Sequence, residues 1–119
     1  MNLNSILIGT ENAERLVEYY TRVLGAPAFS DSGYTGWQIG SGFVTVGPHS
    51  DVKGKNASPG RIIWNIESED VKGDFDRFKA AGATVIAEPY GMEGQEGSAI
   101  ATFADPDDNY FQLMARMEM

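Results

Sequence analysis

The sequence contains no cysteine and only one histidine, His49. Without cysteine there is no disulfide framework, no thiolate metal site and no cysteine nucleophile. A single imidazole also excludes any site that needs two histidines from one chain. The sequence carries neither a G-x-G-x-x-G motif, nor a P-loop, nor a serine in a nucleophile-elbow pattern. It therefore offers none of the common motifs for zinc, nucleotide or serine-hydrolase chemistry.

Positive charge is scarce. Lys and Arg number 9 against 17 Asp and Glu, which gives a formal net charge of −8. Nucleic-acid binding needs clustered Lys and Arg on the phosphate backbone, so this composition argues against a nucleic-acid partner. It argues against an anionic membrane surface for the same reason. A surface this acidic favours cationic ligands.

Long hydrophobic runs are also missing. No segment approaches the roughly 20 apolar residues that a bilayer span needs. The N-terminus shows neither the basic region nor the apolar core of a secretory signal. We therefore expect a cytoplasmic protein, and 119 residues fit one compact domain.

An internal repeat is present at about half the length of the chain. Residues 6–12 resemble residues 64–70 at an offset of 58, and Gly25 and Gly82 follow at an offset of 57. In each half a short apolar run precedes residues that favour a helix N-cap, then a helical apolar stripe, then a glycine. The sequence therefore predicts two copies of one plan, unless the similarity of short strand–helix units arises by chance.

The expected elements follow this plan. Apolar runs predict first strands at 4–9 and 61–67, and three- and four-residue spacing predicts helices over 13–24 and 71–81. Later strands are expected at 27–32, 35–40, 42–47, 84–89, 98–104 and 109–116. Neither half alone buries enough surface for stability. We expect one domain with module 1 over 1–48, a polar linker over 49–60 and module 2 over 61–119.

Three segments resemble the vicinal oxygen chelate superfamily, which contains glyoxalase I, extradiol dioxygenases and bleomycin-resistance proteins. Residues 18–25 (EYYTRVLG) and 78–83 (FKAAGA) are similar to its two helix ends. Residues 103–113 (FADPDDNYFQL) are similar to its C-terminal hairpin, with Asp108 where glycine is usual. Asp tolerates a left-handed turn position better than most residues do.

The resemblance implies an α+β fold with two βαβββ modules that form a curved-sheet cup, helices outside. Metal-dependent members hold a divalent ion in the cup on four side chains, usually His, Glu or Gln. The corresponding positions here are Ser5, Thr45, Ile63 and Gln112. Divalent ions need imidazole, carboxylate or several oxygen ligands, so we expect no metal and no cofactor.

Strand alternation identifies the residues of the mixed polar and apolar face that should line the cup. The predicted ligand-binding residues are Ser5, Leu7, Tyr34, Trp37, Phe43, Thr45, Arg61, Ile63, Asn65, Tyr90, Met92, Tyr110, Gln112 and Met114. Several of these have simpler interpretations. Trp37 and Phe43 suit a hydrophobic core, Arg61 suits a surface ion pair, and Gln112 suits a structural hydrogen bond.

The favoured hypothesis is a metal-free protein that binds a small molecule, similar to the bleomycin-resistance branch, which sequesters drugs or metabolites. The ligand is expected to be cationic or planar and aromatic, and a homodimer is expected by analogy alone. One alternative is a glyoxalase- or dioxygenase-type enzyme whose metal ligands are misplaced here. A third hypothesis is a degenerate member that acts only as a partner subunit. The catalytic residues and the ligand remain undetermined at this level.

Overall fold

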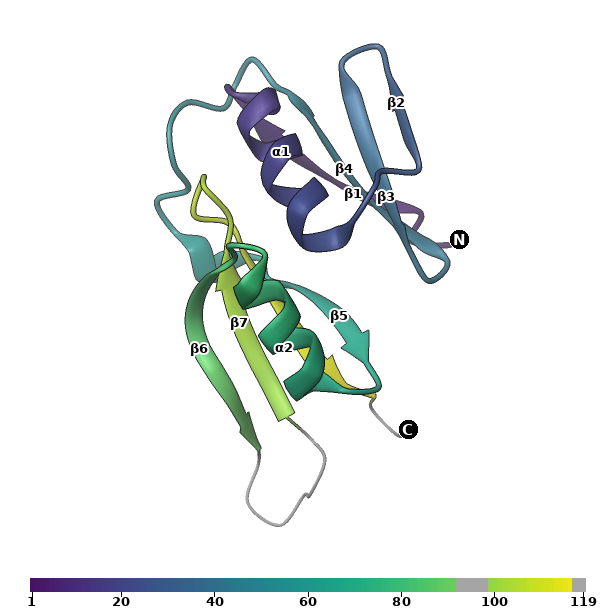
Figure 1. The fold of residues 1–119 in the computed structure, drawn as a ribbon. Coiled ribbons are helices and arrows are strands. Elements are labelled where there is room, and N and C mark those ends of the chain that lie inside the picture. Colours follow the sequence, from purple (N-terminus) through teal and green to yellow (C-terminus); the bar gives the residue numbers. More distant parts are fainter. Residues whose placement is uncertain (92–98, 117–119) are drawn as a thin grey trace. The chain divides into compact units, whose positions relative to one another are not determined.

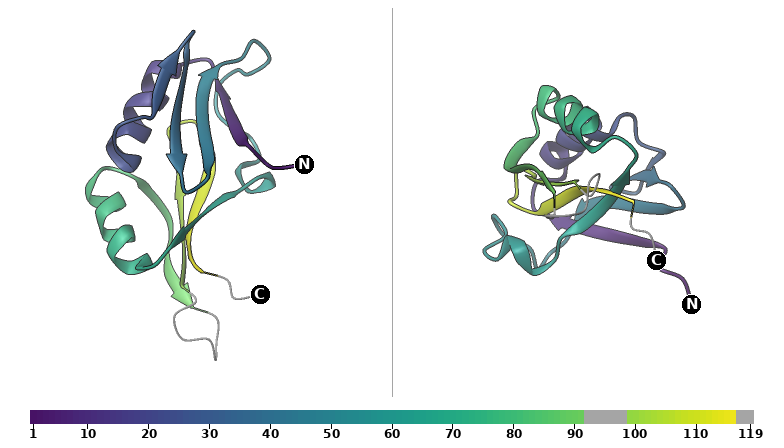
Figure 2. Two further views of the ribbon diagram at one scale, coloured as in Figure 1. Left: turned by 90° about the vertical axis from the view of Figure 1, so that its right-hand side faces the viewer. Right: turned by 90° about the horizontal axis from the view of Figure 1, so that it is seen from below.

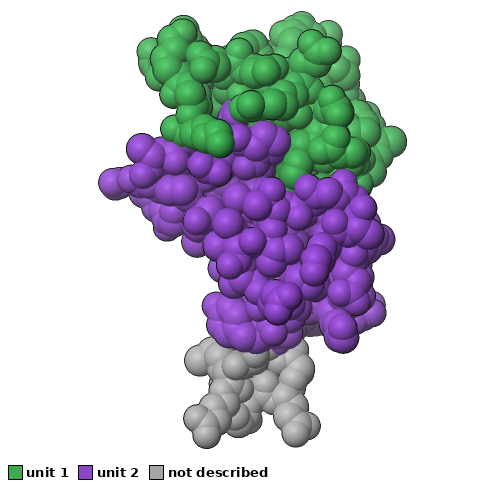
Figure 3. All heavy atoms as spheres, turned by 60° about the vertical axis from the view of Figure 1, so that its left-hand side comes forward, with its two compact units in different colours: residues 1–55 green, residues 56–119 purple. Residues whose placement is uncertain are grey.

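The computed structural model describes residues 1–91 and 99–116 (Figure 1). Its elements along the chain are β1 (Ser5–Thr10), α1 (Ala13–Leu24), β2 (Phe29–Asp31), β3 (Tyr34–Ile39), β4 (Gly42–Pro48), a 3-10 turn η1 (Pro59–Arg61), β5 (Trp64–Ser68), α2 (Val71–Ala80), β6 (Thr84–Gly91), β7 (Ala99–Ala104) and β8 (Tyr110–Ala115). The chain forms two compact units, Met1–Lys55 and Asn56–Met119, which Figure 3 distinguishes by colour. The boundary lies within the segment expected to be a linker.

Each unit contains one four-stranded sheet and one helix. In unit 1 the strand order is β1-β4-β3-β2, and in unit 2 it is β5-β8-β7-β6. The outer first strand pairs in parallel with the last strand of its module, whereas the other neighbours are antiparallel. The two units thus repeat one topology. The expected fold class, α+β with two βαβββ modules, is confirmed.

The helix of each unit packs on one face of its own sheet, as Figure 2 shows. In unit 1, Tyr20 of α1 contacts Trp37 of β3 with ring centroids 5.9 Å apart, and both side chains are buried. In unit 2, Phe75 and Phe78 of α2 contact Phe103 of β7 at 5.6 and 5.5 Å. These buried apolar faces form the core of each unit. Burial of their aromatic side chains supplies much of the folding free energy.

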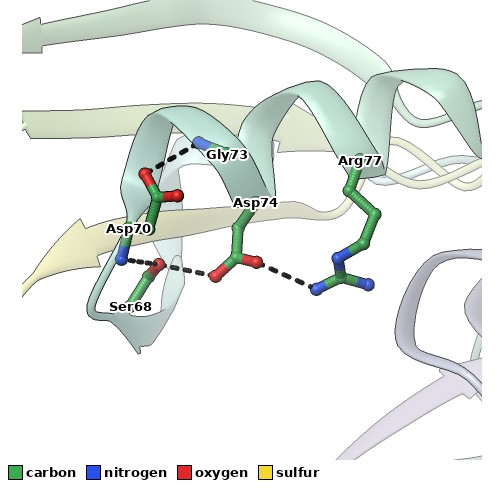
Figure 4. Close-up of polar contacts among 5 residues, drawn as sticks. All are labelled: Ser68, Asp70, Gly73, Asp74 and Arg77. Atoms are coloured by element: carbon green, nitrogen blue, oxygen red, sulfur yellow. Dashed lines mark hydrogen bonds and ion pairs between the residues drawn. The ribbon is translucent and has the colours of Figure 1, made fainter.

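The two helices begin in the same way, 58 residues apart. Before α1, the amide of Asn12 donates to Thr10 Oγ1, and the Asn12 side chain accepts from the amide of Arg15. Before α2, the amide of Asp70 donates to Ser68 Oγ, and Asp70 accepts from the amide of Gly73 (Figure 4). Each side chain satisfies an amide that the first helical turn leaves unpaired. The repeat found in the sequence therefore extends to individual hydrogen bonds.

The turn between β7 and β8 is held by a buried carboxylate. Asp105 Oδ1 accepts hydrogen bonds from the amides of Asp107 and Asn109, at 2.9 Å each. Asp108 adopts a φ of +62°, a left-handed conformation that aspartate, asparagine and glycine tolerate better than other residues. Asn56 joins the turn through a hydrogen bond from its side-chain nitrogen to Asn109 Oδ1 at 3.2 Å.

The boundaries of most elements shift by one or two residues from expectation, and the largest shift lies at the start of β5. The first strand of unit 2 begins at Trp64 rather than at Arg61, because Pro59–Arg61 form a 3-10 turn. Proline at the start of this turn fixes a backbone angle suited to a helical turn and lacks the amide that a strand would use. Among the described residues no helix is long and apolar enough to cross a membrane.

Candidate functional site

Each sheet has a second face, which does not pack against the helix of its unit and which we call the open face. In unit 1 the register places Ile8, Val44 and Trp37 on the helix side, so the residues that alternate with them belong to the open face. The open face of unit 1 consists of Ser5, Leu7, Gly9, Phe29, Asp31, Tyr34, Gly36, Gln38, Phe43, Thr45 and Gly47.

Two aromatic rings on this open face lie over glycines of the neighbouring strand. Phe29 of β2 covers Gly36 of β3, so a Cβ on Gly36 would collide with ring carbons Cε1 and Cζ. Tyr34 of β3 covers Gly47 of β4 in the same way. Because Gly36 has no side chain, the Phe29 ring reaches across β3 and meets Phe43 of β4, with centroids 6.1 Å apart. Three aromatic rings, those of Phe29, Tyr34 and Phe43, therefore lie on the open face of unit 1.

The open face of unit 2 is more polar. It includes Asn65 and Glu67 of β5, which pair with Gln112 and Met114 of β8. Gln112 donates from Nε2 to Oγ1 of Thr102 on β7 at 2.9 Å. This bond supports the interpretation of Gln112 as a structural hydrogen-bonding residue. The bond uses the amide nitrogen of Gln112 and does not involve its amide oxygen. A half-buried amide held in this way is suited to recognising a ligand by direction.

The four positions that correspond to the family's metal ligands do not fit a divalent ion. Ser5 and Thr45 lie on the open face of unit 1, and Gln112 lies on that of unit 2. Ile63 precedes β5 and has no donor atom. Two hydroxyls, one amide and an alkyl chain lack the imidazole and carboxylate ligands that such ions prefer. Over residues 1–91 and 99–116, no three His, Cys, Asp or Glu side chains form a potential metal site.

The structure places most of the predicted lining residues on the open faces, but Trp37 lies elsewhere. Trp37 is 2% exposed, packs on Tyr20 and donates from Nε1 to the carbonyl oxygen of Gly25 at 2.9 Å. Its alternative interpretation as a core residue agrees with this placement. Arg61 is exposed on the 3-10 turn rather than on a strand, and Met92 lies outside the described residues.

The remaining predicted residues are distributed over both units. Ser5, Leu7, Tyr34, Phe43 and Thr45 share the open face of unit 1. Asn65, Tyr110, Gln112 and Met114 share that of unit 2, where Tyr90 pairs with Ile100 near the end of β6. Leu7 and Tyr90 are 51% and 52% exposed.

The open-face residues that the sequence analysis did not predict include Phe29, Asp31, Gln38 and Thr102. Strand β2 has only three residues, too few for alternation to reveal which side chains share a face. A usable signal was nevertheless present, since glycine inside a strand often marks the close approach of another group. Gly36 and Gly47 carry that signal, and their aromatic neighbours confirm it.

His49 lies at the edge of the same region. A Cβ added to Gly9 would lie only 2.9 Å from the Cβ of His49. The Nδ1 of His49 accepts a hydrogen bond from the amide of Asp51 at 3.2 Å. His49 therefore covers Gly9 at the end of β1, on the side of Ser5 and Leu7. Its ring nitrogen supports the local turn.

The strands of the described residues contain no Lys or Arg. The nine basic residues all lie on helices, turns or connecting segments: Arg15, Arg22, Lys53, Lys55, Arg61, Lys72, Arg77, Lys79 and Arg116. The same strands contain three exposed carboxylates, Asp31, Glu67 and Glu88. The register places Asp31 and Glu67 on the open faces. Charge on these faces is therefore exclusively negative.

Comparison with known proteins gives one family and several related folds. Residues 5–114 match the family described as a glyoxalase-like domain. No curated protein matches the sequence.

Three solved structures illustrate the structural likeness. A glyoxalase-related enzyme from Fulvimarina pelagi shares 19% identity with a TM-score of 0.73, over 98% of this chain and 88% of that one. A glyoxalase/bleomycin resistance protein/dioxygenase from Nocardioides shares 16% identity with a TM-score of 0.73, over 99% and 85%. TioX from Micromonospora sp. ML1 shares 18% identity with a TM-score of 0.72, over 98% and 100%. At these identities the likeness establishes the fold alone.

Proposed function

Since the chain belongs to the glyoxalase-like domain family, we propose that it binds a small organic molecule on an open sheet face without a bound metal ion. The observation that carries this proposal is the donor set at the family's four ligand positions. Ser5, Thr45, Ile63 and Gln112 together offer neither imidazole nor carboxylate. These side chains are poor ligands for the metal ion that acts as the Lewis acid in metal-dependent isomerisation or ring cleavage.

The character of the open faces supports binding. In unit 1, Leu7, Phe29 and Tyr34 are 51%, 43% and 38% exposed, although large apolar side chains are usually buried. In unit 2, Gln112 and Thr102 form a fixed polar pair. Apolar surface with a few oriented polar groups is typical of small-molecule sites. Sequestration of a toxic metabolite or antibiotic is the proposed role, and a homodimer remains a prediction.

The first test is the metal content of the untagged protein. After incubation with Zn²⁺, Ni²⁺, Mn²⁺ or Fe²⁺ and desalting, we expect elemental mass spectrometry to find far less than about one ion per chain, because the donor set lacks strong ligands. About one retained ion per chain would contradict the metal-free proposal and favour an enzyme. In that case the Gln112→Ala variant shows whether the ion uses the predicted position, with Glu88→Gln as the matched control.

A further inference from the structure

We propose that the open face of unit 1 is the part of the binding site that takes a planar cation, through Phe29, Tyr34 and Asp31. We call these three residues the aromatic platform. This inference rests on the proposed function, because it assumes that the chain binds a small molecule. It goes further by naming the chemical class of the ligand and the side chains that recognise it.

The two rings of the aromatic platform are held in place by the sheet beneath them. Each ring occupies the space above a glycine, Phe29 over Gly36 and Tyr34 over Gly47. Phe29 also contacts Phe43 of β4. A ring supported on one side by backbone loses little conformational freedom on binding, which lowers the entropic cost of stacking. Both side chains nevertheless stay about two-fifths exposed, at 43% and 38%.

The two rings are diagonal neighbours on one face of the sheet. Phe29 pairs with Gly36 of β3, and Tyr34 lies two residues before Gly36 on the same strand and face. Diagonal neighbours on one sheet face are about 7–8 Å apart, within reach of one fused aromatic ring system. The geometry therefore suits a flat, extended molecule better than a compact one.

The charge on this face is negative. Asp31 is the direct cross-strand partner of Tyr34 and is exposed on the same face. No Lys or Arg lies on β1, β2, β3 or β4. A cation over these rings is attracted by their π faces and by the carboxylate, whereas an anion meets no compensating charge. The strand side chains on the open face of unit 1 thus favour a positive charge over a negative one.

A set of three probes with one ring skeleton tests the inference on the intact chain. The probes are 9-aminoacridine, which is a cation at neutral pH, neutral acridone and the anion acridine-9-carboxylate, and binding is followed by fluorescence anisotropy. We expect 9-aminoacridine to bind most tightly. Phe29→Leu and Tyr34→Leu should each weaken it about tenfold, because leucine keeps apolar volume but removes the ring.

The contribution of charge needs its own pair of variants. Asp31→Asn should weaken 9-aminoacridine about threefold and leave acridone unchanged. Glu88→Gln removes the same charge from β6 of unit 2 and should change neither. Circular dichroism of each variant establishes that it is folded, and Gly42→Ala on β4 is a further control for unit 1, since no ring lies over Gly42.

Each result has a definite meaning. Tight binding of a probe that the Phe29, Tyr34 and Asp31 variants leave unchanged overturns the aromatic platform while the proposed small-molecule function stands. Preference for the anion overturns it as well. If none of the three probes binds, both proposals fail for this ligand class. Self-association in sedimentation experiments that Phe29→Leu and Tyr34→Leu abolish would assign the face to a second copy of the chain instead.

Discussion

Two glycines in unit 1 are explained by their neighbours rather than by a turn. Gly36 and Gly47 lie inside strands β3 and β4, where glycine usually weakens pairing. Each stands beneath an aromatic ring of the adjacent strand, in space that a side chain would need. Covering a strand glycine with a cross-strand aromatic side chain is a known way to offset its destabilising effect. The glycines and the rings therefore form matched pairs.

Replacing Gly36 by alanine should lower the free energy of unfolding by about 1–3 kcal/mol, because the Phe29 ring must move to admit the new methyl group. Urea denaturation measures the change. Gly42→Ala is the matched control, since the nearest atoms to its Cβ are 3.8 and 4.0 Å away. It should keep the stability within about 0.5 kcal/mol or raise it. Equal losses in both variants would contradict the pairing.

At this scale the sequence predicts part of the site. Alternation along β1, β4, β5 and β8 correctly assigns four residues to the open face of their unit, namely Leu7, Thr45, Asn65 and Gln112. Trp37 was included among the lining residues as an aromatic side chain on a strand expected to curl around the first half. The register with Val44 places it on the helix side instead. Phe29 was missed because cross-strand partners depend on register, which the hairpin between β2 and β3 sets.

The helices show how closely the two modules correspond as structural elements. In both modules a hydroxyl oxygen two residues before the N-cap accepts a hydrogen bond from the N-cap amide. The hydroxyl belongs to Thr10 in unit 1 and to Ser68 in unit 2. In unit 2 the network extends further, since Ser68 donates to Asp74 at 2.6 Å and Asp74 accepts from Arg77 (Figure 4). The starts of α1 and α2 are therefore fixed by short local sequences, independent of the rest of the fold.

Removing either N-cap should cost a similar amount. Asn12→Ala and Asp70→Ala should each reduce the free energy of unfolding by about 1 kcal/mol, because an amide of the first turn loses its acceptor. Chemical denaturation followed by circular dichroism provides the measurement. Asp70→Asn retains a capping oxygen and should remain close to the wild type. A loss in Asp70→Asn as large as in Asp70→Ala would contradict a capping role.

The sequence predicts elements well where local chemistry determines them. Helix starts at Ala13 and Val71 follow from their N-caps, and Gly25 and Gly82 follow the helices with positive φ, as expected for stop signals. The start of β5 was wrong because an apolar pattern continues through Ile62 and Ile63, whereas the chain has no strand pairing there. Pairing is a long-range property that a local pattern does not contain.

For the whole molecule, the separation of charge is the dominant feature. Basic residues lie on helices and connecting segments, and acidic residues outnumber them by 17 to 9. The ion pairs on the helices, such as Arg22 with Glu18, are exposed at 49% and 70%. Exposed pairs of this kind contribute little to stability. Repulsion among uncompensated carboxylates should therefore outweigh these attractions.

Raising the NaCl concentration from about 10 mM to about 300 mM should raise the melting temperature by a few degrees, because salt screens repulsion within a chain of net charge −8. Differential scanning calorimetry at neutral pH measures the shift. Sucrose at the same osmolality is the control for non-ionic effects of the solute. A lower melting temperature in salt would show instead that attractive pairs dominate.

The absence of basic residues from the strands also determines where trypsin can act. Trypsin cleaves after Lys and Arg, and none of its sites interrupts a strand of the described residues. Lys53, Lys55 and Arg61 are exposed between β4 and β5, where cleavage leaves the strands of both sheets uncut. Limited proteolysis should thus divide the chain close to the boundary of its two units, and the products would report whether one βαβββ module keeps its fold without the other.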